Sequence, residues 1–382
     1  MIVNPITDAE YHARIERLRG DLDRAGLDAL IAYGAHRDYH PADLRYLARW
    51  YCVEEETAAL FVPREGPTVL LTDAAWDIDR AKAEAVADEM VLSRDLGERL
   101  GQLIGDRLNR DGKAPRVGIA GWEIFPAPTY MALQEAAPHA QLTGASELTE
   151  ELRMVKSPAE LDLMRAASRI SDQAMAAGLN EIRDGASELD VAAAAEAVIR
   201  EAGCEPSFVT EMGSGPRTAL GTFLPGPRQL RAGEFAVLDC GARINGYHGD
   251  MCRTVVVGGA SAEQARKLEA VEAAVQAAIA AIKPGVTVGA IRDIAANSIS
   301  DAGFGDAWWD AFMPHGNGAG QHEAPNAKEH PGMQLRAGMV LCIEPGLTFA
   351  DEGAVIIEQM IAVGDNGAEV LNSLPTRMWS ER

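Results

Sequence analysis

The sequence predicts two domains: an α/β domain over residues 1–150, then an α+β domain over residues 151–382 made of two similar halves. Helical and strand-like runs alternate along the first part, and several short segments of the second part recur about a hundred residues later. The chain, at 382 residues, also exceeds the size at which one hydrophobic core usually stops growing.

The first domain alternates between helix-like and strand-like patterns. Apolar residues recur with helical spacing over residues 11–27, around 78–89 and over 95–110. Short apolar runs typical of strands lie at 28–34, 58–62, 68–73 and 116–121. This alternation is typical of an α/β domain.

A long helix is expected to open the second domain at Ser157-Pro158-Ala159-Glu160. The serine can cap the helix, proline suits its first turn, and the glutamate can bond back to the capping residue.

Beyond this helix the second domain repeats itself. Residues 182–187 recur as 282–287, 201–203 as 301–303, and 229–241 as 334–346. Each half therefore predicts helix, turn, helix and strands, related by an approximate two-fold axis. In this alignment Asp239 falls on Glu344. Carboxylates inside apolar strands are rarely buried unless they are paired or hold a metal, so the pair predicts a metal or catalytic site, with structural ion pairs as the alternative.

Residues 235–257 predict a β-hairpin that brings two aspartates together. Asn245-Gly246 suits a two-residue type I′ turn, which sets Gly241 opposite Asp250. Asp239 then lies on the same face as Asp250, as a diagonal neighbour roughly 7–8 Å away at the backbone. Carboxylates at this spacing could bracket two metal ions about 3.5–4 Å apart.

The second half supplies further ligand types. Glu344 and Glu358 lie in apolar strand-like sequence, and His315 and His322 stand seven residues apart in a glycine-rich segment. Four carboxylates and one imidazole suit Mn²⁺, Fe²⁺, Co²⁺ or Zn²⁺ better than soft thiophilic metals.

The overall composition excludes several other classes of function. A net charge of −22 would repel a nucleic acid backbone, so nucleic acid is not an expected partner. The N-terminal sequence lacks the apolar run of a signal peptide, and no later run has the length of a membrane span. The five cysteines form no CxxC pair and are expected to be reduced thiols in a cytoplasmic protein that does not bind membranes.

These residues and their spacing resemble the pita-bread metallopeptidase family (M24), which includes aminopeptidase P, prolidase and the metal-free relative creatinase. The separation of eleven between Asp239 and Asp250 and of seven between His315 and His322 is that of the family. The resemblance covers nearly the whole chain. It implies a creatinase/prolidase-like N-terminal domain over 1–150 and a pita-bread catalytic domain with internal pseudo-two-fold duplication over 151–382.

The resemblance also implies a site and an activity. Two divalent ions, with manganese first and iron, cobalt or zinc as alternatives, would be held by Asp239, Asp250, His315, Glu344 and Glu358. His322 would face the substrate and steady its carbonyl, and Glu344 would relay a proton to the leaving nitrogen. The implied enzyme is a homodimeric Xaa-Pro peptidase, in which a metal-bridging hydroxide hydrolyses a short peptide or a similar small C–N bond.

Three positions depart from the family pattern. Thr222 stands where peptidase members carry a histidine, Ile356 replaces an arginine and Gln359 an aspartate. The alternative function therefore keeps the fold and metals but acts on a small zwitterion, as in the dimethylsulfoniopropionate lyase branch of the family and, without metal, in creatinase and ectoine hydrolase. A non-enzymatic binding protein is disfavoured because all five ligands are kept.

The segment 45–63 corresponds to a region that, in creatinase-like relatives, reaches from the partner subunit over the active site. Here it carries three consecutive acids at 54–56. We therefore expect Glu54 and Glu56, with Thr222 and His322, to contact the substrate, the two acids selecting a positively charged group. The alternative is a solvated acidic turn.

Overall fold

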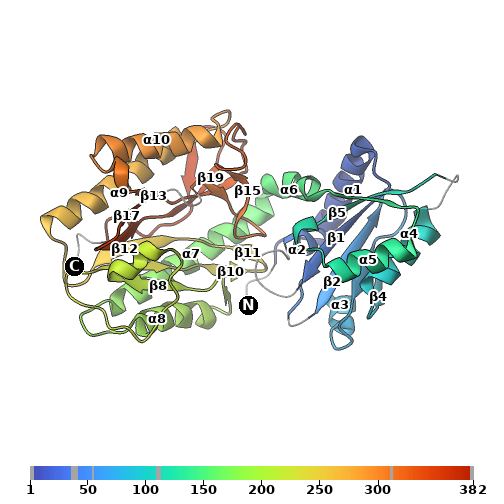
Figure 1. Ribbon diagram of the computed structural model, residues 1–382, viewed down its shortest axis with the longest axis horizontal. Helices are drawn as coiled ribbons and strands as arrows, with labels where there is room; N and C mark the ends of the chain where they lie inside the picture. Colours follow the sequence, from blue (N-terminus) through green and yellow to red (C-terminus); the bar gives the residue numbers. More distant parts are fainter. Residues whose placement is uncertain (1–3, 36–41, 54–55, 109–112, 310–312, 379–382) are drawn as a thin grey trace. The chain divides into compact units, whose positions relative to one another are not determined.

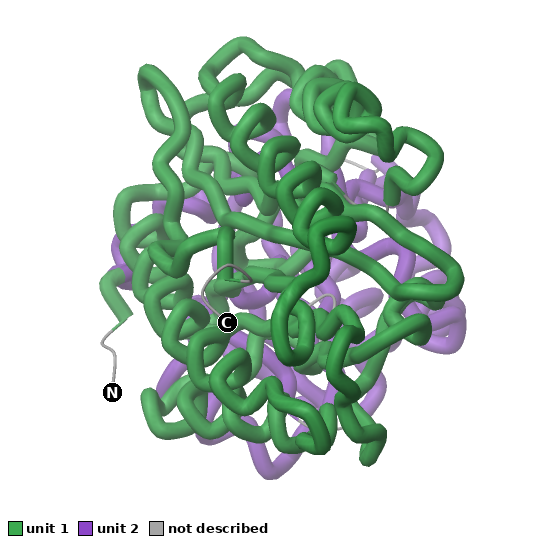
Figure 2. The backbone as a smooth tube through the Cα atoms, turned by 90° about the vertical axis from the view of Figure 1, so that its left-hand side faces the viewer, with its two compact units in different colours: residues 1–5, 154–382 green, residues 6–153 purple. Residues whose placement is uncertain are grey.

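The computed structural model describes residues 4–35, 42–53, 56–108, 113–309 and 313–378. The chain divides into two compact units (Figure 2). The N-terminal unit is Ile6–Arg153, and the second unit, named the catalytic unit after the expectation above, combines Met1–Pro5 with Met154–Arg382.

The N-terminal unit is built on one six-stranded mixed sheet with the order β4-β3-β2-β1-β5-β6 (Figure 1). Strand β2 pairs antiparallel with both β1 and β3, whereas β4, β5 and β6 pair in parallel with their neighbours. The strands are β1 (Ala29–Ala35), β2 (Thr57–Pro63), β3 (Val69–Thr72), β4 (Glu89–Leu92), β5 (Arg116–Ala120) and β6 (Gln141–Gly144).

Helices cover both faces of this sheet because the apolar residues of β1 alternate between two cores. Leu30 packs with residues of α1, α2 and α6, while Ile31 packs with residues of α4 and α5. The helices are α1 (Asp8–Ala25), α2 (Ala42–Ala48), α3 (Ile78–Glu84), α4 (Leu96–Leu108), α5 (Ala127–Ala136) and α6 (Ser146–Met154), with a 3₁₀ turn η1 (Trp122–Ile124). The predicted α/β class is confirmed.

One predicted element is wrong at its end. The helix expected around 78–89 stops at Glu84, and Glu89 instead begins β4, where it pairs in parallel with Val69 of β3. Pairing with a neighbouring strand is a tertiary effect that local periodicity does not contain.

In the catalytic unit each half begins with a pair of helices. These are α7 (Pro158–Glu181) and α8 (Glu188–Glu201) in the first half, and α9 (Ala262–Ala281) and α10 (Val288–Asp301) in the second. The predicted capping box at Ser157 is present, and equivalent boxes at Ser187 and Ser261 and a threonine cap at Thr287 begin the other three helices. The caps repeat with the sequence, so the duplication is structural.

The strands of the catalytic unit form four small sheets, ordered β11-β10-β7, β12-β9-β8, β13-β17-β18 and β15-β14-β16-β19-β20. Helices α7 and α8 contact the strands of the first half, and α9 contacts those of the second (Figure 1). The first half holds β7 (Glu205–Pro206), β8 (Glu211–Ser214), η2 (Gly215–Leu220), β9 (Phe235–Asp239), β10 (Ala242–Ile244), β11 (Tyr247–His248) and β12 (Cys252–Val256). The second holds η3 (Gly305–Ala307), β13 (Trp308–Trp309), β14 (His315–Gly316), β15 (Glu323–Asn326), β16 (Val340–Ile343), β17 (Gly346–Phe349), β18 (Gly353–Ile356), β19 (Gln359–Val363) and β20 (Ala368–Val370).

The predicted hairpin has the predicted register. Asn245 and Gly246 both have positive φ, at 48° and 88°, as a type I′ turn requires, and Ile244 pairs with Tyr247. Further along, Asp239 pairs with Cys252. The hairpin is nevertheless divided between two sheets, since its tip belongs to β10 and β11 and its base to β9 and β12.

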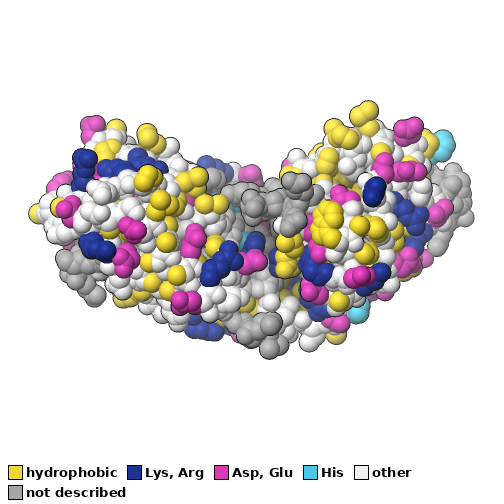
Figure 3. Space-filling model, turned by 90° about the horizontal axis from the view of Figure 1, so that it is seen from below, with side chains coloured by type: hydrophobic (Ala, Val, Ile, Leu, Met, Phe, Trp, Pro, Cys, Tyr) yellow, Lys and Arg dark blue, Asp and Glu magenta, His cyan; other side chains and the backbone are white. Residues whose placement is uncertain are grey.

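Acidic and basic side chains are interspersed over the face of the molecule shown in Figure 3. Interspersed charges of both signs on this face are typical of an ordinary solvated surface. None of the helices in the described ranges combines the length and the apolar character needed to span a bilayer.

Candidate metal centre

The five predicted ligands lie at or near the ends of strands. Asp239 ends β9 and Asp250 lies two residues before β12, whereas His315 begins β14, Glu344 follows β16 and Glu358 precedes β19. Strands β14, β16 and β19 are neighbours in one sheet. The second-half ligands therefore come from adjacent strands.

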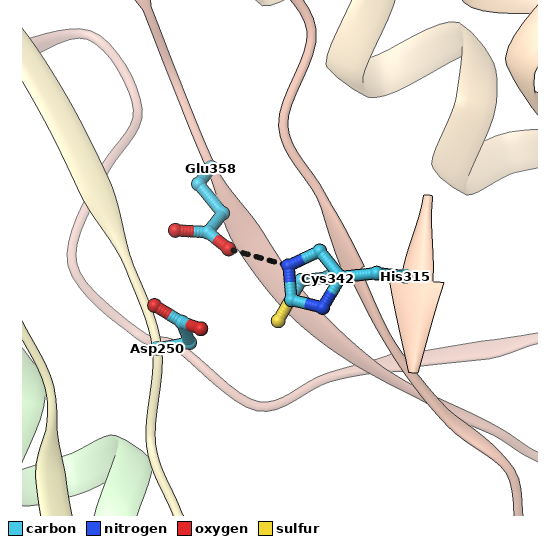
Figure 4. Close-up of side chains that lie close together, drawn as sticks. All are labelled: Asp250, His315, Cys342 and Glu358. Atoms are coloured by element: carbon cyan, nitrogen blue, oxygen red, sulfur yellow. Dashed lines mark ion pairs between the residues drawn. The ribbon is translucent and has the colours of Figure 1, made fainter. Parts of the chain in front are cut away.

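Four side chains form a tight cluster at these strand ends: Asp250, His315, Glu358 and Cys342 (Figure 4). One potential ligand atom from each lies within 4.8 Å of all the others. Nε2 of His315 lies 3.8 Å from Oε1 of Glu358 and 3.4 Å from Oε1 of Glu344.

His315 is oriented by the backbone. Its Nδ1 lies 3.0 Å from the carbonyl oxygen of Gly316. A carbonyl can only accept, so Nδ1 carries the hydrogen and Nε2 is left to face the carboxylates. Donation of the second ring nitrogen to a carbonyl is the usual arrangement of a metal-binding histidine.

The carboxylates of the site are buried and repel one another. Burial, followed by the negative charges of neighbouring acids, raises the pKa of Asp239 and of Glu358 well above the usual range. Burial raises the pKa of Asp250 to about 7, although His315 opposes this change. Burial disfavours the charged form of His315, but Glu344 and Asp250 outweigh it and raise the pKa of the ring.

A cation fits this arrangement. Within the described part of the chain, Oδ1 of Asp239 and Oε2 of Glu358 are buried and have no hydrogen-bond partner. A buried carboxylate oxygen without a partner is costly, and a divalent cation would supply both the missing partner and the missing positive charge.

The structure thus brings Asp250, His315 and Glu358 into one cluster, with Glu344 beside His315. Asp239 lies outside the four-residue cluster but close enough for the charges of Asp250 and Glu344 to raise its pKa. The assignment of all five as metal ligands remains a prediction.

His322 lies against His315, with ring centroids 4.1 Å apart and planes at 44°. Whereas His315 is buried, His322 is exposed, as a group that meets substrate must be. Its partly desolvated position and the neighbouring His315 lower its pKa to about 3, so the ring is neutral at physiological pH. Between the two histidines, a β-carbon on Gly316 would overlap the backbone carbonyl oxygens of Glu323 and Ala324, so this position requires glycine.

Sequence reasoning did not assign several neighbours to the site. Cys342 belongs to the tight cluster, and the side-chain amide of Asn317 donates to Oδ2 of Asp250 at 3.3 Å. Glu211 is the strand partner of Asp239 and raises its pKa. Alternation along the strand offered a signal for Cys342, because it stands two residues before Glu344. No comparable signal marked Glu211, since β8 was not predicted.

The three departures from the family pattern have different surroundings. Thr222 is exposed in the loop after η2. Ile356 packs in a small apolar cluster with Phe223 and Cys252, among others. Gln359 is buried and accepts a hydrogen bond from Arg253.

The predicted acidic contacts are not supported at the position that can be described. Glu54 lies outside the described residues. Glu56 is only 1% exposed, 3.6 Å from Arg80, and its Oε1 accepts a hydrogen bond from the backbone of Val53. The Glu56 carboxylate is therefore enclosed by its own unit, which argues against a role in selecting substrate.

Comparison with known proteins supports the geometry. Residues 162–365 match the model of metallopeptidase family M24, and residues 14–155 match the creatinase/prolidase N-terminal domain. An Xaa-Pro dipeptidase of Pyrococcus furiosus is 34% identical over 226 residues, which cover 59% of this chain and 65% of that relative, slightly under two thirds of its length.

Solved structures agree over nearly the whole chain. The prolidase from Pyrococcus horikoshii superposes with a TM-score of 0.85 at 25% identity, and an Xaa-Pro dipeptidase from Bacillus anthracis with 0.84 at 27% identity. Each comparison covers 96% of this chain and 99% of the other. The predicted resemblance and fold class are confirmed: a creatinase-like N-terminal domain precedes a pita-bread catalytic domain, and the chain belongs to metallopeptidase family M24.

Proposed function

We propose that this protein is a dinuclear metal-dependent hydrolase of the Xaa-Pro peptidase type, which cleaves the bond before proline in a dipeptide or short peptide. Similarity to an Xaa-Pro dipeptidase and to prolidase structures supports the substrate class. The family model supports the dependence on metal.

One observation carries the proposal. A buried imidazole and two buried carboxylates converge on one point, and Oε2 of Glu358 has no partner among the described residues. A structural ion-pair network would supply arginine or lysine to these acids. The charges that raise the pKa values of Asp239 and Glu358 are instead those of further acids.

Asp239, Asp250, His315, Glu344 and Glu358 would hold two divalent cations. Bound there, these ions would polarise the scissile carbonyl and lower the pKa of water.

Two further side chains would handle the substrate. The neutral ring of His322, exposed beside His315, is positioned to donate a hydrogen bond to the substrate carbonyl oxygen. Glu344, next to the imidazole of His315, would carry a proton to the leaving nitrogen.

A small zwitterion is the second candidate substrate. Two observations favour it. Thr222, which replaces a family histidine, is exposed and cannot act as a general acid near neutral pH. Ile356 places a buried apolar side chain where the family pattern has an arginine.

Manganese, a homodimer and a cytoplasmic location complete the proposal. The oxygen-rich ligand set supports Mn²⁺, with iron, cobalt or zinc as alternatives. Inductively coupled plasma mass spectrometry of protein purified without added metal, sedimentation, and cell fractionation would test these three points.

The function is tested with the full chain. Release of proline is measured from Xaa-Pro dipeptides and tripeptides, before and after chelation and after return of Mn²⁺, alongside turnover of small betaines. We expect two bound cations per chain, peptide turnover that chelation abolishes, and His322→Ala to lower kcat by about 100-fold or more.

Full activity after complete chelation would overturn the metal mechanism. Turnover of betaines without any Xaa-Pro cleavage would replace the peptidase with the second candidate. The comparison of dipeptides with tripeptides decides between a dipeptidase and an aminopeptidase.

A further inference from the structure

Cys342 faces the candidate metal centre rather than the apolar core. It lies in β16 between Leu341 and Ile343, which both belong to the main core of the catalytic unit. Successive side chains of a strand point to opposite faces, so Cys342 is directed to the other side. Its Sγ is one of the four atoms that lie within 4.8 Å of one another (Figure 4).

The register of the sheet explains this position. Cys342 is directly opposite His315 on β14 and opposite Met360 on β19. Direct partners in antiparallel strands share a face, and so do residues two apart. Glu344 and Glu358, two residues from Cys342 and from Met360, therefore project to the same face as the thiol and the imidazole.

The side chain of Asn317 orients the sulfur and a neighbouring carboxylate toward the centre of the cluster. The side-chain amide of Asn317 donates to Sγ of Cys342 at 3.7 Å and to Oδ2 of Asp250 at 3.3 Å. Asn317 is 0% exposed. An amide that donates to two potential ligands at once orients both, as the outer partners of metal ligands do.

An independent observation points to a bound cation at this place. Glu358 is 1% exposed and belongs to the same cluster as Cys342, yet its Oε2 has no hydrogen-bond partner among the described residues. A cation bound by the Glu358 carboxylate would supply the missing partner, and one oxygen of this carboxylate lies within 4.8 Å of the sulfur.

We propose that Cys342 is an additional, sulfur ligand of the cation held by Asp250, His315 and Glu358, and that it shifts the preference of the site toward thiophilic divalent ions such as Zn²⁺ and Cd²⁺. This inference rests on the proposed function and changes the order of the metals given there. On binding, the thiol proton passes to solvent and a sulfur–metal bond forms, so no oxidant or reductant is required.

Cys252 provides a matched contrast. Both thiols are 0% exposed and lie in strands of the catalytic unit. Cys252 is the strand partner of Asp239 and so shares its face, but it packs in an apolar cluster with Phe223 and Ile356. Its sulfur is not part of the four-atom group. We therefore interpret Cys252 as a small apolar side chain that fills space in the core, whereas the sulfur of Cys342 lies among potential metal ligands.

The test is spectroscopic and does not use activity. Metal-free full-length protein is titrated with Cd²⁺ and, separately, with Co²⁺, while the ultraviolet thiolate-to-metal charge-transfer band is recorded. Competition with Mn²⁺ gives the relative affinities. The same titrations are made with Cys342→Ser and with the control Cys252→Ser, and circular dichroism of each variant checks its folding.

We expect the wild type and Cys252→Ser to show the charge-transfer band, and Cys342→Ser to bind Cd²⁺ without it. The serine at 342 should lower Cd²⁺ affinity by about tenfold or more, the scale on which even outer partners of metal ligands act, and change Mn²⁺ affinity much less. Cd²⁺ binding by the wild type without a thiolate band overturns the inference, even if the variants fail to fold.

The outcomes separate this inference from the proposed function. Binding of two cations with no sulfur signature leaves the hydrolase intact and removes Cys342 as a ligand. Failure to bind any divalent cation removes both. A charge-transfer band that persists in Cys342→Ser but disappears in Cys252→Ser would identify Cys252 in β12 as the sulfur ligand and overturn the inference.

Discussion

Nζ of Lys156 lies 2.8 Å from Oε1 of Glu323, and the two side chains are only 1% and 3% exposed. The other oxygen of Glu323 accepts a hydrogen bond from the backbone of Gly320 at 3.2 Å. This buried ion pair joins the residue before the α7 cap to the loop that carries His322. It therefore helps to hold the loop of His322, the residue proposed to meet the substrate.

Replacing only one partner of this ion pair should strongly destabilise the catalytic unit. We expect Lys156→Met to cost about 3–5 kcal/mol, because the Glu323 carboxylate is left buried without its cation. The double variant Lys156→Met, Glu323→Leu should recover a large part of this loss. Denaturant unfolding followed by fluorescence measures both, and equal losses in the single and double variants would contradict the role of the pair.

Arg253 is held by a complete set of neutral acceptors, and replacing it by lysine should be costly. Its five N–H groups donate to four backbone carbonyls and to the side chain of Gln359. Lysine has three donors, so at least two buried acceptors lose their partners, at about 1–3 kcal/mol each.

The control for this change is Arg266→Lys, at a site where the arginine side chain is 62% exposed. It should change the free energy of unfolding by less than about 0.5 kcal/mol. If Arg253→Lys were equally mild in urea unfolding, the network around the guanidinium would not contribute to stability. Burial also lowers the pKa of Arg253 to about 10.

Asp239 is expected to bind one of the two cations, so Asp239→Asn should reduce the metal content from two ions per chain toward one. The strand partner Glu211 provides the comparison, because it lies beside Asp239 but is not a predicted ligand. Glu211→Gln should keep both ions. Mass-spectrometric metal analysis after dialysis gives the stoichiometry, and unchanged metal content in Asp239→Asn would remove this residue from the ligand set.

Glu56 should make the N-terminal unit less stable as pH rises. Burial raises the pKa of Glu56 from 4.5 to about 7, and Asp77 adds to this while Val53 and Arg80 oppose it. A raised folded-state pKa stabilises the fold below pH 4.5, and this stabilisation is lost as pH rises to about 7. The pKa of Asp77 is lowered from 3.8, chiefly by Arg80, so the contribution of Asp77 to the pH dependence of stability lies at a lower pH than that of Glu56.

Glu56→Gln isolates this effect. The variant keeps a neutral hydrogen-bonding side chain that does not titrate. Its free energy of unfolding should therefore not decrease between pH 4.5 and 7 as that of the wild type does. Urea unfolding of the N-terminal unit at a series of pH values in this window provides the measurement. A variant whose pH profile matches that of the wild type would show that another group titrates.

The hairpin shows how much of the site local sequence contains. Asn245-Gly246 fixes a two-residue turn, and from that turn alone follows the pairing of Asp239 with Cys252. The repeat of segments likewise predicted that Asp239 and Glu344 occupy equivalent places. The first argument succeeds because backbone geometry propagates along a strand, and the second agrees with Asp239 ending β9 and Glu344 following β16.

The partners of several buried charged side chains depended on contacts between distant parts of the chain. Lys156 and Glu323 are 167 residues apart in sequence, and Arg253 and Gln359 are 106 apart. Glu56 belonged to an apparent acidic turn, yet the fold buries it beside Arg80. Local periodicity carries no information about which distant group will become the partner of a buried charge.

The sequence by itself determined the two-domain organisation, the repeat, the family and the identity of the acids and histidines expected at the metal centre. Only the tertiary structure decided that Cys342 shares their face, that Asn317 links this thiol to Asp250, and that Glu56 is enclosed. The physical reason is that spacing along a chain fixes turns and strand faces, whereas the neighbours of a buried group are fixed by how separate strands are brought into register.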